Sequence, residues 1–293
     1  MHAQPTCVLA CDNELGECPI WCPTTRRLWW IDVARPTLWR FDPATGASEN
    51  WPLPKPPAAI ALRRSGGLLI LFRRGYALID APPPGAAIGQ THGLDLGEER
   101  FNDGKVAPDG RMWVGSMDRA LKSPIGRLYR FTPDDGADSG LQPMDEGFVL
   151  SNGLGWSPDG RALYFAETRS KHVYKYDRDP VSGAIGTRQL FTTLDGEGVP
   201  DGLTVDAAGH VWIAAFGGSA VHRFRPDGSL ASRTALPVEH PTSCTFGGDD
   251  LRVLYITSAR RGIEGNARAM PQAGGLWAVR LDVAGLPETP LSC

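Results

Sequence analysis

Short apolar runs recur along the whole chain, and most of them contain a Trp, Tyr or Phe. Runs such as Arg27–Asp32, Ala162–Ala166 and His210–Ala214 are five or six residues long, a length typical of β-strands. Turns such as Pro108–Gly110 and Pro158–Gly160 separate the runs, and their Asp-Gly pairs supply the positive φ that tight hairpins need. Almost no segment has the i, i+3, i+4 apolar spacing of an amphipathic helix. The pattern predicts an all-β protein.

The apolar runs belong to a unit that is repeated six times. Each copy has a turn, an apolar strand, a gap and a second strand with an aromatic or apolar pair. One residue of each first strand serves as a marker, and the markers lie 40, 44, 51, 48 and 43 residues apart: Trp29, Leu69, Trp113, Tyr164, Trp212 and Tyr255. This is the spacing of four-stranded propeller blades, whereas a β-sandwich fits six such copies badly. We predict one domain over residues 1–293, a six-bladed β-propeller of four-stranded antiparallel blades.

The N-terminal run Thr6–Ala10 has no partner within the repeats. We expect it to add a strand to the last blade, so that both ends of the chain close the ring. Closure is favourable because it removes exposed sheet edges.

Oxygen-bearing side chains occupy one register position of the repeat. Eleven or twelve residues before the markers lie Glu17, Ala58, Asn102, Asn152, Asp201 and Ser243. Because the innermost strands of a propeller start at the same end of its axis, these residues are expected to form a ring. Converging carboxylate and amide oxygens need a compensating cation. Hard oxygen ligands without His or Cys suit calcium, magnesium or manganese better than zinc. We predict one divalent metal ion on Glu17, Asn152 and Asp201.

Two of these ligands also stand in ordinary turn dipeptides, Asn152-Gly153 and Asp201-Gly202. Each pair alone predicts only a turn. The shared register across blades favours the metal site, as does Glu17, which belongs to no such pair.

Composition narrows the choice of function. The net charge is -3 and the basic residues are scattered, which disfavours nucleic-acid binding. No apolar run approaches the length of a membrane span, and Met1–Leu15 does not resemble a secretory leader. We therefore expect a cytoplasmic protein without a membrane partner. The sequence contains neither a Gly-x-Ser-x-Gly elbow nor a His-Glu-x-x-His motif.

Four of the six cysteines lie within the first 22 residues: Cys7, Cys11, Cys18 and Cys22. Their spacing is not that of a zinc knuckle. We expect reduced, partly buried thiols, with zinc ligation or disulfides as the alternative.

Several motifs together resemble one known family. They run in order along the chain and comprise Leu15–Trp21, Arg100–Lys105, Ser151–Leu154, Pro200–Gly202, Cys244–Gly248, Leu254–Arg260 and Gln272–Gly275. They are similar to the successive signatures of the senescence marker protein/gluconolactonase/luciferin-regenerating-enzyme family. Its members include regucalcin and bacterial aldonolactonases such as xylonolactonase.

The resemblance implies a site and a reaction. The family's metal ligands fall on Glu17, Asn152 and Asp201, and its substrate-contacting Arg and Asn fall on Arg100 and Asn102. Asp201 would also act as the catalytic acid/base. The implied reaction is metal-dependent hydrolysis of a sugar lactone to its aldonic acid. Calcium is the first expectation for the ion, with zinc, manganese, magnesium and ferrous iron as alternatives.

The chain departs from the family pattern at two positions. Some relatives have an acidic substrate-binding residue where this chain has Ala120, and Asp118 is the candidate to replace it. Others have Asp where this chain has Gly155. Two alternative functions stay open: a non-enzymatic calcium-binding or interaction propeller, and a paraoxonase-like esterase, for which the sequence offers no His pair. The sequence leaves the oligomeric state and the preferred lactone open.

Overall fold

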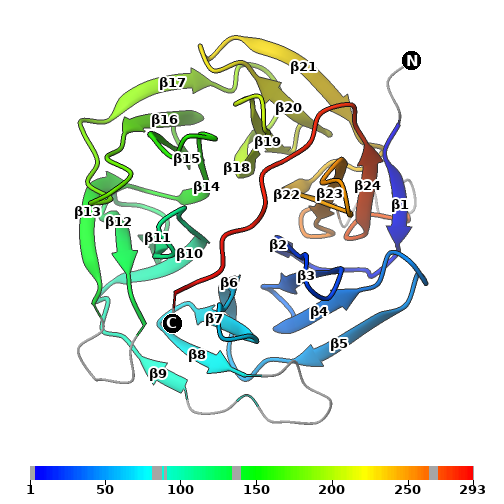
Figure 1. The fold of residues 1–293 in the computed structure, drawn as a ribbon, viewed down its shortest axis with the longest axis horizontal. Helices are drawn as coiled ribbons and strands as arrows, with labels where there is room; N and C mark the ends of the chain where they lie inside the picture. Colours follow the sequence, from blue (N-terminus) through cyan, green and yellow to red (C-terminus); the bar gives the residue numbers. More distant parts are fainter. Residues whose placement is uncertain (1–3, 81–87, 89–90, 134–139, 264–269, 293) are drawn as a thin grey trace.

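Six four-stranded antiparallel sheets form a ring around a central channel (Figure 1). This computed structural model describes residues 4–80, 88, 91–133, 140–263 and 270–292. Within these ranges the regular elements are all strands, without a helix. The predicted six-bladed propeller is therefore confirmed.

The first strand of each blade lines the channel, and the later strands lie progressively further out (Figure 1). The first blade consists of β2 (Gly16–Cys22), β3 (Arg27–Asp32), β4 (Thr37–Phe41) and β5 (Ser48–Pro52). The second consists of β6 (Pro57–Leu62), β7 (Leu68–Phe72), β8 (Gly75–Ile79) and β9 (Thr91–Gly93). The third consists of β10 (Glu99–Val106), β11 (Met112–Asp118), β12 (Gly126–Phe131) and β13 (Gln142–Phe148).

The other three blades repeat this order, except that the last one uses both ends of the chain. The fourth consists of β14 (Ser151–Trp156), β15 (Ala162–Glu167), β16 (His172–Asp177) and β17 (Gln189–Thr193). The fifth consists of β18 (Val199–Val205), β19 (Val211–Phe216), β20 (Ala220–Phe224) and β21 (Leu230–Ala235). The sixth consists of β22 (Pro241–Gly247), β23 (Val253–Ser258), β24 (Leu276–Arg280) and β1 (Thr6–Leu9).

Strand β1 pairs with β24, with Thr6 opposite Ala278, and so completes the last blade. The predicted closure of the ring by the N-terminal strand is confirmed. The six marker residues all lie in the second strand of their blade and are at most 3% exposed. Burying each of these side chains contributes about 1.5–3 kcal/mol. The repeat detected in the sequence thus reflects one packing arrangement that recurs in every blade.

All six innermost strands are irregular near their first residues. The register with the second strand shifts between Glu17 and Ile20, and equivalent shifts lie at Pro57/Ala59, Phe101/Asp103, Ser151/Leu154, Pro200/Leu203 and Pro241/Ser243. Each residue predicted for the ring lies inside such a shift or at its end. A bulge bends a strand and redirects a side chain, and bulges are frequent beside active sites. The register shifts thus take the ring residues out of the regular pairing between the first and second strands of each blade.

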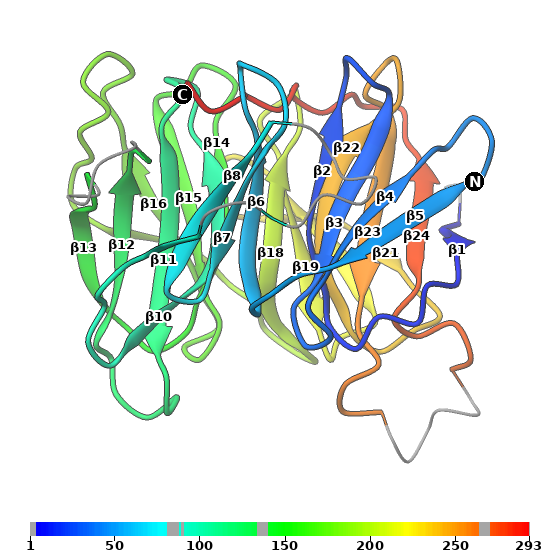
Figure 2. The ribbon, with the colours of Figure 1, turned by 90° about the horizontal axis from the view of Figure 1, so that it is seen from below.

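The C-terminal segment 281–292 crosses the mouth of the channel at which the innermost strands end (Figures 1 and 2). Leu291 is 1% exposed and donates its backbone N–H to Leu62 O at 2.8 Å. Ser292 donates likewise to Gly110 O at 2.9 Å. The segment, which starts after β24 of the sixth blade, is therefore tied across the channel to the second and third blades.

One ion pair fastens this segment to the channel wall. Lys105 Nζ lies 3.4 Å from Glu288 Oε1, which also accepts a hydrogen bond from Thr245 Oγ1 at 2.9 Å. Burial lowers the pKa of Lys105, but Glu288 outweighs it and raises the pKa overall. Because the pKa is raised, the pair's contribution to stability is fully present at neutral pH.

We expect Glu288→Gln to lower the free energy of unfolding by about 1–3 kcal/mol at pH 7. The substitution keeps an acceptor for Thr245 but leaves the Lys105 ammonium without a counter-ion. Urea titration measures the change. The double variant Lys105→Met/Glu288→Gln removes both charges and should recover most of the loss. A double variant as unstable as Glu288→Gln alone would contradict the ion-pair explanation.

Candidate active site

Four of the predicted site residues lie at the channel mouth where the innermost strands begin. Glu17 lies in β2, Asn102 in β10, Asn152 in β14 and Asp201 in β18. Asn152 and Asp201 are 6% and 5% exposed, whereas Glu17 and Asn102 are half-buried. The Asn-Gly and Asp-Gly pairs are therefore part of strands, not turns. The structure brings together residues that are distant in the sequence.

Glycine follows both Asn152 and Asp201 because neighbouring innermost strands touch at these points. A Cβ on Gly153 would lie 2.5 Å from the backbone nitrogen of Leu203. Glycine is required here because two backbones approach each other closely, not because the chain turns.

A chain of hydrogen bonds fixes the amide groups. Asn102 Nδ2 donates to Ser151 O at 2.8 Å and to Asn152 Oδ1 at 3.3 Å. Asn152 Nδ2 donates to Thr168 Oγ1 at 2.9 Å, and that hydroxyl donates to Pro200 O at 2.8 Å. Because both hydrogens of Asn102 are engaged, its Oδ1 is the atom that remains to accept further bonds. From the described residues Asn152 Oδ1 accepts only this one long bond, so it retains capacity for a ligand.

Three carboxylates share this end of the channel. Burial, followed by the charges of Asp201 and Asp103, raises the pKa of Glu17 well above its ordinary value. Burial and the charge of Asp103 do the same to the pKa of Asp201. Burial raises the pKa of Asp103 to about 6, although the Gly104 N–H and Lys105 oppose the shift. Asp201 Oδ1 is buried without a hydrogen-bond partner in the described residues. A cation at this mouth would relieve both the repulsion and the missing partner.

The backbone next to Glu17 adopts an uncommon conformation. Cys18 has φ = 51° although it is not a glycine. Its Sγ accepts a hydrogen bond from the backbone nitrogen of Ile60 at 3.4 Å. Non-glycine residues in this region carry strain of order 1–3 kcal/mol, and such residues cluster at functional sites. The strain here falls directly on the bulge that presents Glu17.

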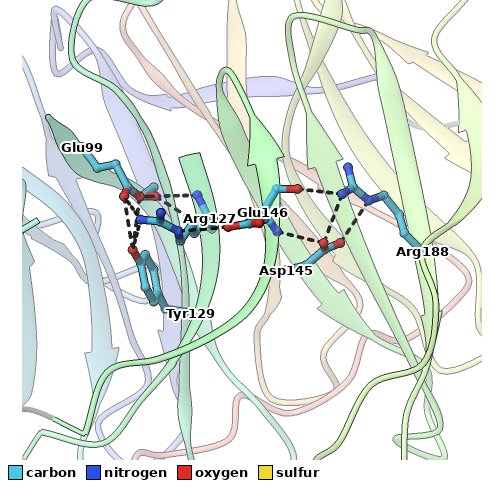
Figure 3. A network of polar contacts seen from close by, with 7 residues as sticks. Glu99, Arg127, Tyr129, Asp145, Glu146 and Arg188 are labelled. Carbon is cyan, nitrogen blue, oxygen red and sulfur yellow. Dashed lines mark hydrogen bonds and ion pairs between the residues drawn. The ribbon is translucent and has the colours of Figure 1, made fainter. Parts of the chain in front are cut away.

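Strand β10, which carries Arg100 and Asn102, is anchored at its first residue. The Glu99 carboxylate pairs with Arg127 and accepts hydrogen bonds from Ser116 Oγ and from Tyr129 OH, the latter at 3.2 Å (Figure 3). Glu99 is buried, and both of its carboxylate oxygens are already engaged by these neighbours. Its role is to hold the strand end from behind.

The same polar network continues to the next blade. Asp145 accepts a hydrogen bond from Tyr176 OH at 2.7 Å. It also pairs with Arg188, whose Nε lies 3.0 Å from Asp145 Oδ2 (Figure 3). Strand β13 of the third blade is thereby joined to the fourth blade, whose β14 carries Asn152. The spacing of the two site-bearing strands is thus supported from outside.

The Asp118 carboxylate forms hydrogen bonds within its own loop. Oδ1 accepts the N–H of Ala120 at 3.0 Å, and Oδ2 accepts those of Lys122 and Ser123 at 2.8 and 2.7 Å. These backbone N–H groups lower the pKa of Asp118. The carboxylate therefore shapes the loop after β11, and its contact with a substrate stays a prediction.

Other candidate chemistry is limited in the residues that the structure describes. Cys7, Cys11, Cys18 and Cys22 are free thiols, as expected. No group of three or more His, Cys, Asp or Glu side chains there is arranged to hold a metal ion. The predicted set differs in kind, because it combines two carboxylates with the Asn152 amide. The described part of the chain also has no helix with the length and apolarity of a membrane span.

A cavity of about 190 Å³ lies at the opposite mouth, beneath the C-terminal segment. Its lining includes Lys105, Thr204, Leu286 and Glu288. Lys105 and Glu288 already neutralise one another. The unpartnered carboxylate oxygen lies at the other end of the channel, which we therefore take as the candidate active site.

The fold and this geometry define a class: a six-bladed propeller with a polar site of carboxylate and amide oxygens at one end of its axis. The chain belongs to the SMP-30/gluconolactonase/LRE-like family, whose model matches residues 15–260. This confirms the family resemblance inferred from the motifs.

Similar proteins span the chain almost completely. A 6-deoxy-6-sulfogluconolactonase of Pseudomonas putida is 36% identical over 291 residues, covering 98% of each chain. A pentonolactonase of Haloferax volcanii is 35% identical over 289 residues, covering 94% of each. Among solved structures, a calcium-binding regucalcin from Agrobacterium tumefaciens superposes with a TM-score of 0.90 at 27% identity, covering 100% of this chain and 98% of the other.

Sequence reasoning missed two residues that shape the site. Asp103 lies within the Arg100–Lys105 motif but is not among the predicted site residues, although its charge acts on both Glu17 and Asp201. Thr168, which bonds Asn152, lies just after β15 and belongs to none of the motifs. The position of Asp103 directly after Asn102 was the one available signal.

Proposed function

We propose that this protein is a metal-dependent sugar lactonase that hydrolyses an aldonolactone to its aldonic acid. Two relatives that match it from end to end are named as sugar lactonases. The observation that carries the proposal is the Asp201 carboxylate, which is buried at the channel mouth beside Glu17 and has one oxygen without a partner in the described residues. A buried acid with a free oxygen is a suitable proton acceptor.

The donor set fits a hard divalent cation, and calcium is our first candidate. Glu17, Asn152 and Asp201 would hold it through two carboxylates and one amide oxygen. When bound, such an ion polarises a lactone carbonyl and acidifies a water molecule. Three protein ligands are fewer than the six to eight oxygens that calcium takes, so coordination positions would stay available to water and substrate.

The side chains supply the proton transfers. Asp201 takes one proton from the attacking water, whose oxygen bonds to the lactone carbonyl carbon. The bond between that carbon and the ring oxygen then breaks, and Asp201 returns the proton to the departing alkoxide. The products are the free hydroxyl and the carboxylic acid of the open chain, so the enzyme ends as it began.

Two further side chains would orient the sugar. Arg100 Nη1 donates to Phe101 O at 3.0 Å and to Asn102 Oδ1 at 3.2 Å, which leaves other guanidinium N–H groups for ligand hydroxyls. Asn102 Oδ1 would accept a second bond from a sugar hydroxyl. Because both residues lie on β10, one strand would set the sugar's position relative to Asp201.

The test is an activity matrix on purified protein that is first chelated and then reloaded with single metals. Lactones of five- and six-carbon aldonic acids are assayed by pH-stat, since each turnover releases a proton. We expect no activity without metal and recovery with one or more divalent ions. Metal-replete protein that hydrolyses none of these lactones would refute the proposal and favour a calcium-binding propeller without enzymatic activity.

A further inference from the structure

Three arginines gather at the site's mouth. Arg100 lies on β10, Arg73 follows β7, and Arg261 follows β23. Each strand end faces the side where the innermost strands begin, since Pro57 pairs with Phe72 and Pro241 with Ser258.

The arginines are close enough to act on one another. Burial, then the charges of Arg73 and Arg261, lowers the pKa of Arg100 to about 10. Burial and Arg261 likewise lower the pKa of Arg73. Backbone bonds hold the group in place, because Phe101 N donates to Arg73 O at 2.9 Å.

None of the three guanidinium groups forms an ion pair within the described residues. Arg73 Nε is buried there without a hydrogen-bond partner. Their immediate neighbours behave differently, because Arg74 pairs with Asp95 at 3.2 Å and Arg260 pairs with Asp12. A protein that neutralises adjacent arginines but leaves these three free retains positive charge that favours an anion.

The cluster is connected to the proposed chemistry. Arg100 bonds Asn102, and Asn102 bonds Asn152. An anion held by the arginines would therefore lie beside the substrate position. The site thus combines a group of carboxylates (Glu17, Asp103 and Asp201), suited to a cation, with a group of arginines that carries positive charge.

We infer that the preferred substrate is a lactone with an anionic substituent, such as a carboxylate, sulfonate or phosphate, distant from the ester and bound by Arg73, Arg100 and Arg261. This rests on the proposed lactonase function and specifies its substrate class. Neutral sugar hydroxyls would leave three mutually repelling cations uncompensated, whereas planar guanidinium groups match the oxygens of such anions.

The experiment compares D-glucono-1,4-lactone with D-glucaro-1,4-lactone, which differ only in a hydroxymethyl or carboxylate group at C6. Lactones with a sulfonate or phosphate at C6 form two further arms that distinguish among the anions. The test variant is Arg73→Gln/Arg261→Gln. The matched control, Arg74→Gln/Arg260→Gln, removes two charges at adjacent positions that already have carboxylate partners.

We expect the wild type to prefer at least one anionic lactone. In the test variant, kcat/KM for that lactone should fall on the order of ten- to hundredfold, with the loss mostly in KM. The same variant should change the neutral lactone by less than about threefold, and the control should retain the preference. Equal losses on both lactones, or a wild type without preference, would overturn the inference while leaving the lactonase function intact.

A binding measurement separates failure of the inference from failure of the function. Glucarate and 6-phosphogluconate are titrated calorimetrically against chelated protein, with gluconate as reference. If no lactone is hydrolysed but an anionic acid binds more tightly than gluconate, and the test variant abolishes that difference, the anion site stands without the reaction. Equal binding of all three acids by the wild type would refute the anion site.

Discussion

Asp201→Asn is expected to lower kcat/KM for aldonolactones at least about a thousandfold, because it removes both the proton acceptor and a charged metal ligand. The amide has nearly the shape of the carboxylate, so the strand and its neighbours keep their packing. The loss of charge also relieves repulsion with Glu17, and we expect the metal-free variant to be no less stable than the metal-free wild type. Steady-state kinetics and urea unfolding of chelated protein measure the two effects.

Asp195→Asn is the matched control, since Asp195 is an exposed residue in the connection that leads to the same strand. This variant should retain wild-type turnover and metal affinity. Calorimetric titration with calcium should show weakened binding for Asp201→Asn alone. Turnover by Asp201→Asn within a few fold of the wild type would exclude Asp201 as the proton acceptor, whatever its part in metal binding.

The fold was predictable because every blade buries equivalent side chains against its neighbour. Trp113 and Trp212 occupy equivalent places in the interfaces between blades, so burial forces similar residues to recur at similar spacing. The extra strand at Thr6–Leu9 was predictable for a related reason, since an apolar run without a partner in the repeats must pair elsewhere.

The ring of site residues was predictable only in part. Register counting found Asn152 and Asp201, because equivalent positions in a repeat lie at the same level of the channel. It did not reveal the bulges, which depend on how two backbones pair and have no fixed sequence signal. Taken alone, the dipeptides Asn152-Gly153 and Asp201-Gly202 predict turns, although both glycines lie within strands.

The arginine cluster lay outside the reach of sequence reasoning. Arg73 and Arg261 stand in different blades, follow second strands rather than innermost ones, and have arginines as neighbours that are neutralised by carboxylates. A count of charged residues in the sequence does not distinguish Arg73 and Arg261 from their arginine neighbours. Only the three-dimensional arrangement distinguishes the paired arginines from the free ones.

Gly202→Ala is expected to damage stability and activity together. A Cβ at this position would lie 2.1 Å from Ser243 Oγ and 2.7 Å from Ser243 Cα, so β18 and β22 must move apart. Overpacking of this kind costs about 1–3 kcal/mol. Because Asp201 is the adjacent residue, we also expect a loss of kcat on the order of a hundredfold, since displacements of about 1 Å have effects of that size. Urea unfolding and lactone kinetics measure the two losses.

A second substitution tests whether the contact with Ser243 is the cause. Ser243→Gly removes the Oγ and Cβ that would collide, so Gly202→Ala/Ser243→Gly should regain part of both stability and activity. Gly93→Ala is the control, because a Cβ added to this strand glycine would have no heavy atom within 4 Å, so the methyl group should be tolerated. If the Ser243→Gly change restores neither quantity, close packing of the innermost strands does not explain the glycine after Asp201.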